Sequence, residues 1–307
     1  MVPPSWTCPV CGGSAFEDLY RVPEGRSEQG VDGTAFRPSA DLYGRPVGAV
    51  VRCGRCGHGS LREPPSEAAV SAAYAEAEDP VSIREEPGQV ETARRALERI
   101  ERSVRPGRVL DAGCWTGSFL VAARDRGWDP VGLEPSTWAS DRARERGIEV
   151  HTAELSSHPF EPGSFRLVVM GDVIEHLAEP REALRAVRAL LEPDGALYLT
   201  TPDAGSRVGR LLGRRWWSVL PMHLQYFTRG SLRRLLDAEG LRVRWMATNP
   251  KVFTARYYAE RLAGYSPGLA RGVAGGLTRA GLAGRMVAPD FRDRVEALAI
   301  RANDADH

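Results

Sequence analysis

The chain has 307 residues, and its 41 Lys and Arg residues almost balance its 40 Asp and Glu residues. This length suits one α/β domain of about 200 residues with a smaller unit beside it, because single hydrophobic cores stop growing near ~250 to 300 residues. The balanced charge lacks the basic field that binds nucleic acid. No apolar stretch approaches the ~18 to 20 residues of a membrane span, and the first residues do not resemble a signal peptide. We therefore expect a cytoplasmic monomer or homodimer that binds a small molecule, without nucleic acid or integral membrane association.

Two CxxC pairs near the N-terminus contain four of the five cysteines: Cys8, Cys11, Cys53 and Cys56. Each pair precedes a glycine, which can adopt the positive φ of a tight turn that presents two thiolates to one ion. Two such turns complete a closed tetrahedral site, which is typical of structural zinc. A pair of disulfides is the alternative, and it would need an oxidising compartment. The spacing predicts a zinc-binding, ribbon-like module over residues 1–63, with His58 as a solvated loop residue.

Residues 64–105 are expected to form a helical linker. Within it, apolar residues recur at spacings of three and four between Val90 and Val104, which predicts a helix that packs on the next domain. From residue 106 to 307, strand-like and helix-like segments alternate, as in a doubly wound α/β domain whose parallel sheet is covered on both faces. The expected strands lie at 108–111, 130–134, 165–170, 195–201, 242–248 and 291–301, and helices are expected near 181–191 and 229–239.

A glycine turn follows the first expected strand of this domain. Asp111 lies two residues before Gly113 in "LDAGCWTGS". An acid at that point repels a pyrophosphate but suits a ligand with an ammonium or sulfonium group, which favours S-adenosylmethionine over NAD. Glu134 ends the second strand, 21 residues after Gly113, which is close to the spacing at which doubly wound folds place a carboxylate on a ribose. An NAD-dependent oxidoreductase is the competing enzyme class, and the lack of a complete GxGxxG motif argues against it.

Five segments in this order resemble the motifs of class I S-adenosylmethionine-dependent methyltransferases: "VLDAGCWTGSFL", "VGLEPS", "FRLVVMGDVIEHL", "LLEPDGALYLTTPD" and "HLQYFTRGSLRRLL". Together with the cysteine pairs and "GRRWW", they resemble bacterial methyltransferases of sugar and natural-product pathways. The resemblance implies a seven-stranded, Rossmann-like methyltransferase domain. It also implies a cofactor site made of Asp111, Gly113, Cys114 and Gly117 along the methionine, Glu134 on the ribose hydroxyls, Ala153, Glu154 and Leu155 along the adenine, and Gly171 and Asp172 after the fourth strand.

Methyl transfer to a hydroxyl requires an aligned acceptor and a base. The candidates for the catalytic group are His223 first, then Tyr226 and His176, because their segments follow strands on the side where open α/β sheets bind ligands. The alternatives are a loop histidine bonded to the backbone and a packing role for Tyr226. The adjacent Trp216 and Trp217 would either contact the acceptor or anchor their loop.

A second interpretation involves a metal ion at the same place. Asp172, Glu175 and His176 would share one face if their segment were helical. With His223, they resemble the Glu-x-x-Glu-His plus distant His pattern by which some methyltransferases of the quinone-pathway and small-RNA types hold magnesium. Such an ion would acidify an acceptor hydroxyl. The alternative is that Glu175 and His176 fix the loop beside the cofactor.

The sequence as a whole predicts S-adenosylmethionine-dependent methyl transfer to a small molecule, with a structural zinc ion. The preferred acceptor is a hydroxyl of a sugar or natural-product intermediate, and carbon methylation of a nucleotide-linked sugar is the alternative. A zinc-ribbon binding protein without catalysis is the alternative outside enzymology, and the near-neutral charge argues against it. An insert at about 250–290 is expected to form a helical cap over the acceptor side.

Overall fold

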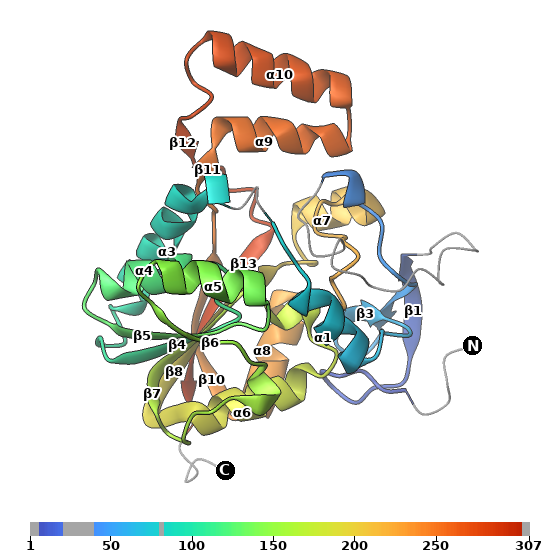
Figure 1. The fold of residues 1–307 in the computed structure, drawn as a ribbon. Helices are drawn as coiled ribbons and strands as arrows, with labels where there is room; N and C mark the ends of the chain where they lie inside the picture. The colour runs from blue at the N-terminus through green and yellow to red at the C-terminus, as the bar shows by residue number, and fades with distance from the viewer. Residues whose placement is uncertain (1–5, 21–39, 80–82, 303–307) are drawn as a thin grey trace.

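The computed structural model describes residues 6–20, 40–79 and 83–302, and a seven-stranded sheet lies at its centre (Figure 1). The strand order is β10-β13-β8-β7-β4-β5-β6. The strands are β4 (Arg108–Ala112), β5 (Asp129–Leu133), β6 (Glu149–His151), β7 (Phe165–Gly171), β8 (Leu191–Pro202), β10 (Leu241–Thr248) and β13 (Arg294–Arg301). The five strands from β8 to β6 run parallel, whereas β13 is antiparallel to both of its neighbours. The predicted seven-stranded α/β fold is confirmed, and β13 departs from the expected parallel arrangement.

Helices cover both faces of this sheet (Figure 1). They are α3 (Glu86–Ile100), α4 (Ser118–Arg124) and α5 (Thr137–Glu145) on one face, and α6 (Pro180–Leu190) and α8 (Arg229–Ala238) on the other. Successive strand residues point to opposite faces. Val109 and Val169 accordingly join the apolar cluster of α3 and α4, whereas Leu110 and Met170 join the cluster of α6 and α8. The core therefore has two layers, one on each side of the sheet.

The helix that the sequence assigned to a linker belongs to the large domain. α3 buries Ala93, Leu97 and Ile100 in the cluster that it shares with α4 and the sheet. The predicted amphipathic stripe is present, and it packs as expected. The domain boundary predicted at residue 106 lies too late, because the stripe completes one helical layer.

A second sheet joins the N-terminal region to the large domain. Its order is β1-β2-β3-β9, with β1 (Phe16–Tyr20), β2 (Val50–Cys53), β3 (Gly59–Leu61) and β9 (Gln225–Tyr226), and all its pairs are antiparallel. The amide of Leu61 also donates to the carbonyl of Leu224 at 2.9 Å. The N-terminal module is therefore completed by the segment directly after His223. Part of the predicted module, residues 21–39, lies outside the described residues.

The segment between β10 and β13 forms a projecting helical pair (Figure 1). It contains β11 (Phe253–Thr254), α9 (Ala255–Arg261), α10 (Pro267–Arg279) and β12 (Met286–Val287). The remaining elements are α1 (Glu67–Ala75), α7 (Arg207–Leu212) and short 3-10 helices: η2 (Ala40–Leu42), η3 (Leu155–Ser157), η4 (Ile174–His176), η5 (Gly213–Arg215) and η6 (Leu262–Gly264). Within the described ranges, no helix has both the length and the apolar character needed to cross a bilayer.

Candidate active site

Two adjoining cavities, of about 340 and 420 Å³, lie at the carboxyl end of the parallel strands, where open α/β sheets bind ligands. Gly113, Asp172 and His176 line both of them. The two cavities therefore form one continuous cleft. We call them the smaller and the larger cavity.

The turn after β4 places backbone at the junction of the two cavities. Gly113 and Gly117 have φ values of +82° and +79°, which favour glycine. A Cβ at Gly113 would also lie 2.7 Å from a methyl group of Val173. Trp115 has φ +49° as well, and its ring packs against Tyr74, with centroids 6.1 Å apart. The indole is thus held against α1 at the wall of the larger cavity.

Two buried carboxyl groups flank this turn. Asp111 lines the larger cavity, and its burial, with a smaller contribution from the charge of Glu134, raises the pKa of Asp111 to about 8. Glu134 is fully buried, and its two oxygens accept hydrogen bonds from the backbone N–H groups of Trp115 and Ser136, both at 2.8 Å. Burial raises the pKa of Glu134 to about 7, although these bonds oppose the shift. Both acids would gain from a ligand that favours their ionised form.

Glu134 lies behind the wall of the smaller cavity, which its neighbours Leu133 and Pro135 line. Each of its oxygens keeps one lone pair beyond the backbone bond that it accepts. The predicted adenine segment, Ala153, Glu154 and Leu155, lines the smaller cavity directly. Glu154 accepts a hydrogen bond from Ser71 of α1. This bond fastens α1 to the wall of the smaller cavity, which α1 helps to line.

Three candidate groups meet in the cleft. The ligand atoms of Glu175, His176 and His223 all lie within 4.8 Å of one another. Nδ1 of His223 lies 2.7 Å from the carbonyl of Ser218, and Nδ1 of His176 lies 3.0 Å from that of Met222. A carbonyl can only accept, so both imidazoles carry the proton on Nδ1 and keep the lone pair on Nε2.

Burial sets the protonation of this cluster. Burial, together with the neighbouring His176, lowers the pKa of His223 to about 3. Burial and then the charge of Asp172 raise the pKa of Glu175 to about 8, and Oε2 of Glu175 accepts from Thr201 Oγ1 at 3.0 Å. At neutral pH, the cluster therefore presents a neutral imidazole and a largely protonated carboxyl group to the cleft.

Asp172 does not join this cluster. Its φ is +59°, and η4 begins only at Ile174, so the expectation that a helix would place residues 172, 175 and 176 on one face is wrong. The carboxylate instead contacts Arg294, Lys251 Nζ at 2.9 Å and Thr200 Oγ1 at 2.6 Å. Burial raises the pKa of Asp172, but Arg294 and Lys251 outweigh it and hold that pKa well below its usual range.

Arg294 and Lys251 were missed from the sequence. Arg294 begins β13 and lies 122 positions from Asp172, and Lys251 follows β10. Neither residue belongs to a local motif. They reach the cleft because β13 pairs with β8 and β10 pairs with β13, and a pattern within one segment does not indicate such pairing.

Two further expectations need correction, and the two alternatives for the adjacent tryptophans are distinguished. Tyr226 is buried and packs edge-on against Tyr20 within the N-terminal sheet, and it lines neither cavity, so the catalytic assignment of Tyr226 is wrong and its role is packing. His58 is not solvated but buried, with Nε2 2.9 Å from Gln225 Oε1. Trp216 anchors its loop through a 3.0 Å bond to Asp293, whereas Trp217 lines the larger cavity.

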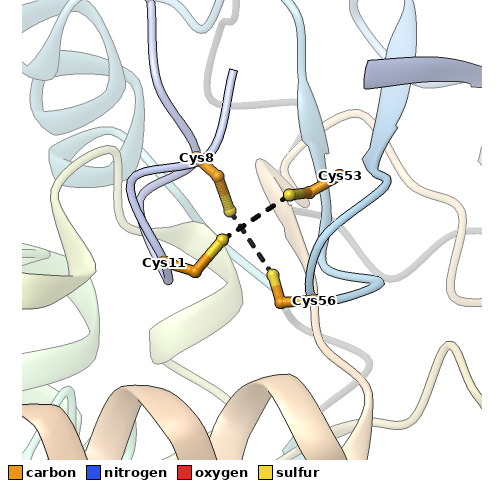
Figure 2. A group of neighbouring side chains, drawn as sticks. All are labelled: Cys8, Cys11, Cys53 and Cys56. Atoms are coloured by element: carbon orange, nitrogen blue, oxygen red, sulfur yellow. Dashed lines mark hydrogen bonds between the residues drawn. The ribbon is translucent and has the colours of Figure 1, made fainter. Parts of the chain in front are cut away.

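The four cysteines of the N-terminal module converge on one point (Figure 2). Their sulfurs lie within 4.8 Å of one another, and the pairs Cys8–Cys56 and Cys11–Cys53 are each 3.6 Å apart. Four thiolates at about 2.3 Å from a zinc ion would be separated by about 3.8 Å. A disulfide requires about 2.05 Å, so the geometry fits a tetrahedral ion and not the disulfide alternative. Gly12 and Gly57, at φ +68° and +72°, complete the two turns as expected.

Comparison with known proteins identifies the domain. A family described as "Methyltransferase domain" matches residues 85–244, more than half of the chain. C-methyltransferase NovU of Streptomyces niveus is 31% identical over 140 residues, which cover 44% of this chain and 33% of NovU. Ubiquinone biosynthesis O-methyltransferase of Aeromonas salmonicida is 26% identical over 154 residues, which cover 46% of this chain and 65% of that protein. The chain thus spans less than two thirds of either relative.

Solved structures show the same fold. A chain from the complex between the Haloferax volcanii Trm112 methyltransferase activator and a methyltransferase matches with a TM-score of 0.52 and 15% identity, over 72% of this chain and 95% of that one. The family match begins at α3, which the structure also places in the large domain, and it includes the glycine turn, Glu134 and His223. The chain therefore belongs to the methyltransferase-domain family.

Proposed function

We propose that the protein transfers the methyl group of S-adenosylmethionine to a hydroxyl group of a small molecule, a sugar or natural-product intermediate. One observation carries this proposal: the cavity that contains Asp111 and the glycine turn also contains His223. A sulfonium held at the turn would face a neutral imidazole across the same cavity. Carbon methylation of a nucleotide-linked sugar is the alternative, and the similarity to a C-methyltransferase keeps it in view.

The cofactor would lie along the whole cleft. Ala153 and Leu155 line the smaller cavity, where the adenine would bind, and Glu134 would use its remaining lone pairs for the ribose hydroxyls. The methionine half would enter the larger cavity beside Gly113. There, Asp111 would ionise and pair with the cationic groups of the ligand, because opposite charge favours the ionised carboxylate.

In the proposed reaction, an acceptor oxygen attacks the methyl carbon in line with the carbon–sulfur bond. The electrons of that bond pass to sulfur, and the hydroxyl proton passes to Nε2 of His223. Attack by a neutral hydroxyl produces an oxonium ion, which is a strong acid. A base with a pKa of about 3 is sufficient to remove that proton, and it remains unprotonated at every physiological pH. Burial of His223 therefore keeps its imidazole neutral and able to accept the proton.

The same cluster also fits a divalent cation. Glu175, His176 and His223 would hold the ion, and it would supply polarisation of the acceptor hydroxyl. Asp172 would not be a ligand, because its oxygens face Lys251 and Arg294. Two imidazoles suit a transition metal better than magnesium. Chelation under conditions that leave the zinc content unchanged, followed by separate magnesium and manganese titrations, decides the matter: restored turnover supports the ion, and unchanged turnover after chelation supports His223 as the base.

Zinc is the proposed ion of the N-terminal cysteines. The support is the tetrahedral arrangement of four sulfurs, which leaves no position open for a substrate. The two cysteine turns sit at the ends of the sheet that β9 completes, so the ion would stabilise the strand directly after His223. Its role would be structural.

Product analysis tests the proposed reaction. The protein is incubated with S-adenosylmethionine carrying a labelled methyl group and with pairs of acceptors that offer either a free hydroxyl or an activated carbon. NMR then locates the methyl group in the product. We expect a methyl ether. A methyl group on carbon would establish the alternative, and the absence of transfer to every acceptor would contradict the proposal.

A further inference from the structure

We propose that the methyl acceptor carries an anionic group, a phosphate or a carboxylate, which binds to a cationic wall formed by Lys251, Arg261 and Arg294. All three residues line the larger cavity. This inference rests on the proposed function, because it assumes that the larger cavity holds both the methionine half of the cofactor and the acceptor.

The sheet order places the cationic wall on the acceptor side. Arg294 begins β13, Lys251 follows β10, and Arg261 ends α9. β13 and β10 lie beyond β8 and β7, on the opposite side of β4 from β5, which leads to Glu134. The wall is therefore at the far end of the cleft from the position expected for the ribose.

The cationic wall has more positive charge than its carboxylate partners neutralise. Lys251 and Arg294 share one acid, Asp172. Arg261 lies 4.4 Å from the ring centre of Tyr257, and among the described residues no carboxylate pairs with it within 4.0 Å. Asp293 precedes Arg294, and its charge helps to raise the pKa of Arg294, but Asp293 accepts a hydrogen bond from Trp216 and does not line the cavity.

The other acids of the larger cavity do not balance this charge. Asp111 belongs to β4 at the glycine turn, and Glu175 belongs to the histidine cluster. Burial raises the pKa of Asp111 to about 8, so this acid is largely protonated at neutral pH, and Oε2 of Glu175 is occupied by Thr201 Oγ1 at 3.0 Å. Partly buried cations without full compensation are costly, and a bound anion would offset that cost.

The surroundings of the cationic wall suit a ligand and not only a structural ion pair. The side chains of Lys251 and Arg294 retain 26% and 21% of their exposure, so both reach the cavity. The aromatic rings of Tyr43, Phe253 and Tyr257 line the same region. Tyr43 comes from the N-terminal module and the other two from the cap segment, so both parts contribute to the proposed acceptor site.

Calorimetric titration of the protein saturated with S-adenosylhomocysteine tests this inference. The probes are glucose 1-phosphate, glucuronate and methyl glucoside, which carry a phosphate, a carboxylate and no charge. The variants are Arg261→Met and Lys251→Met. The matched control is Arg271→Met, which removes an exposed arginine of α10 that does not line the cavity.

We expect an anionic probe to bind and methyl glucoside not to bind. Lys251→Met and Arg261→Met should each weaken binding at least ~10-fold, as for loss of a charge-assisted hydrogen bond, and Arg271→Met should leave it unchanged. The probe that binds more tightly identifies phosphate or carboxylate as the recognised group. The affinity for S-adenosylhomocysteine should stay within about threefold in all variants. Melting temperatures show whether each variant folds. If Arg261→Met does not fold, Lys251→Met alone tests the inference.

Several results would overturn the inference: equal binding of charged and neutral probes, no binding of either anion, or affinities that neither substitution changes. An equal loss of S-adenosylhomocysteine affinity would assign the cationic wall to the cofactor carboxylate and overturn it too. Failure of the unaltered protein to bind S-adenosylhomocysteine would instead contradict the proposed function.

Discussion

The two halves of the cleft are built in different ways. The half around β4, β5 and β6, which comprises the glycine turn and the smaller cavity, takes its lining mostly from the continuous stretch of residues 111–186, with α1 as the one distant element. The half around β8, β13 and β10 takes its lining from the N-terminal module, α3, the loop that carries His223, the cap and the first residue of β13. The first half is local in sequence, and the second is assembled from distant segments.

From this difference we infer that the two halves bind different ligands. A pocket made mostly by consecutive strands and helices can be kept whole while distant segments change, so the local half suits the cofactor and the assembled half suits the acceptor. The division has a measurable consequence. Substitutions in the local half should weaken cofactor binding, whereas substitutions in the assembled half should affect the acceptor or the turnover and leave cofactor affinity nearly unchanged.

The largest effect is expected at the zinc site, with Cys53→Ser. Loss of one thiolate should release the ion and unfold the β1-β2-β3-β9 sheet, because structural zinc contributes ~10 kcal/mol or more to folding. Methyl transfer should fall by ~1000-fold or more, whereas S-adenosylhomocysteine affinity should fall less than about tenfold. Metal analysis and calorimetry measure the two effects. Cys114→Ala, outside the cysteine cluster, should keep its zinc, and a Cys53→Ser variant with full zinc and turnover would refute the prediction.

The next largest effect is expected for His223→Ala. Removal of the proposed base should lower turnover by about 100-fold, while the cofactor affinity stays nearly constant because His223 lies in the assembled half. Turnover in the unaltered protein should show no acidic limb near pH 6.5, since the pKa of His223 is lowered to about 3. Rate measurements from pH 5.5 to 8 check both points. Full turnover in the variant would remove His223 from the mechanism.

A smaller effect, on cofactor binding and not on turnover, is expected for Asp111→Asn in the local half. The variant should bind S-adenosylmethionine about 30-fold more weakly, the value of a hydrogen bond to a charged group. The pKa of Asp111 is about 8 in the free protein, and a cationic ligand favours the ionised form. Binding should therefore release protons below pH 8, and affinity should rise from pH 6 to 8 and then level off.

Calorimetry in two buffers of different ionisation enthalpy counts these protons. The Asn variant should lose most of the release, leaving only the part that comes from Glu134, whose pKa is raised to about 7. Equal proton release by both proteins would show that Asp111 does not meet the cationic end of the cofactor.

The smallest effect is expected for Gln225→Leu, where the N-terminal module contacts the large domain. Gln225 Oε1 lies 2.9 Å from His58 Nε2, and its Nε2 donates to the carbonyl of Leu177 at 3.0 Å. The leucine would leave buried polar groups unpaired two residues after His223, and we expect turnover to fall about tenfold with zinc retained. Arg52→Gln, on the exposed face of β2, is the control and should be neutral. A Gln225→Leu variant as active as this control would show that the module does not position His223.

The sequence predicted what local signals determine. The glycine turn, Asp111, Glu134 and the cysteine turns each depend on a few adjacent residues, and the positions of most strands along the chain follow from repeated strand and helix patterns. No local pattern indicated the positive φ of Asp172. Because of this backbone conformation, Asp172 and Glu175 do not share the predicted helical face.

The assembled half could not be predicted in the same way. The pairing of β3 with β9 joins segments more than 160 residues apart, and this pairing turns Tyr226 into the N-terminal sheet and buries His58. Arg294 reaches Asp172 only because β13 inserts beside β8. Such contacts depend on tertiary packing, which periodicity within one element does not report.

The most direct test of the account is a calorimetric titration of the purified, folded protein with S-adenosylmethionine and S-adenosylhomocysteine. We expect uptake of one cofactor per chain, with an affinity that Asp111→Asn weakens and His223→Ala leaves nearly unchanged. Absence of any uptake by the unaltered protein, or an equal loss of affinity in the two variants, would contradict it.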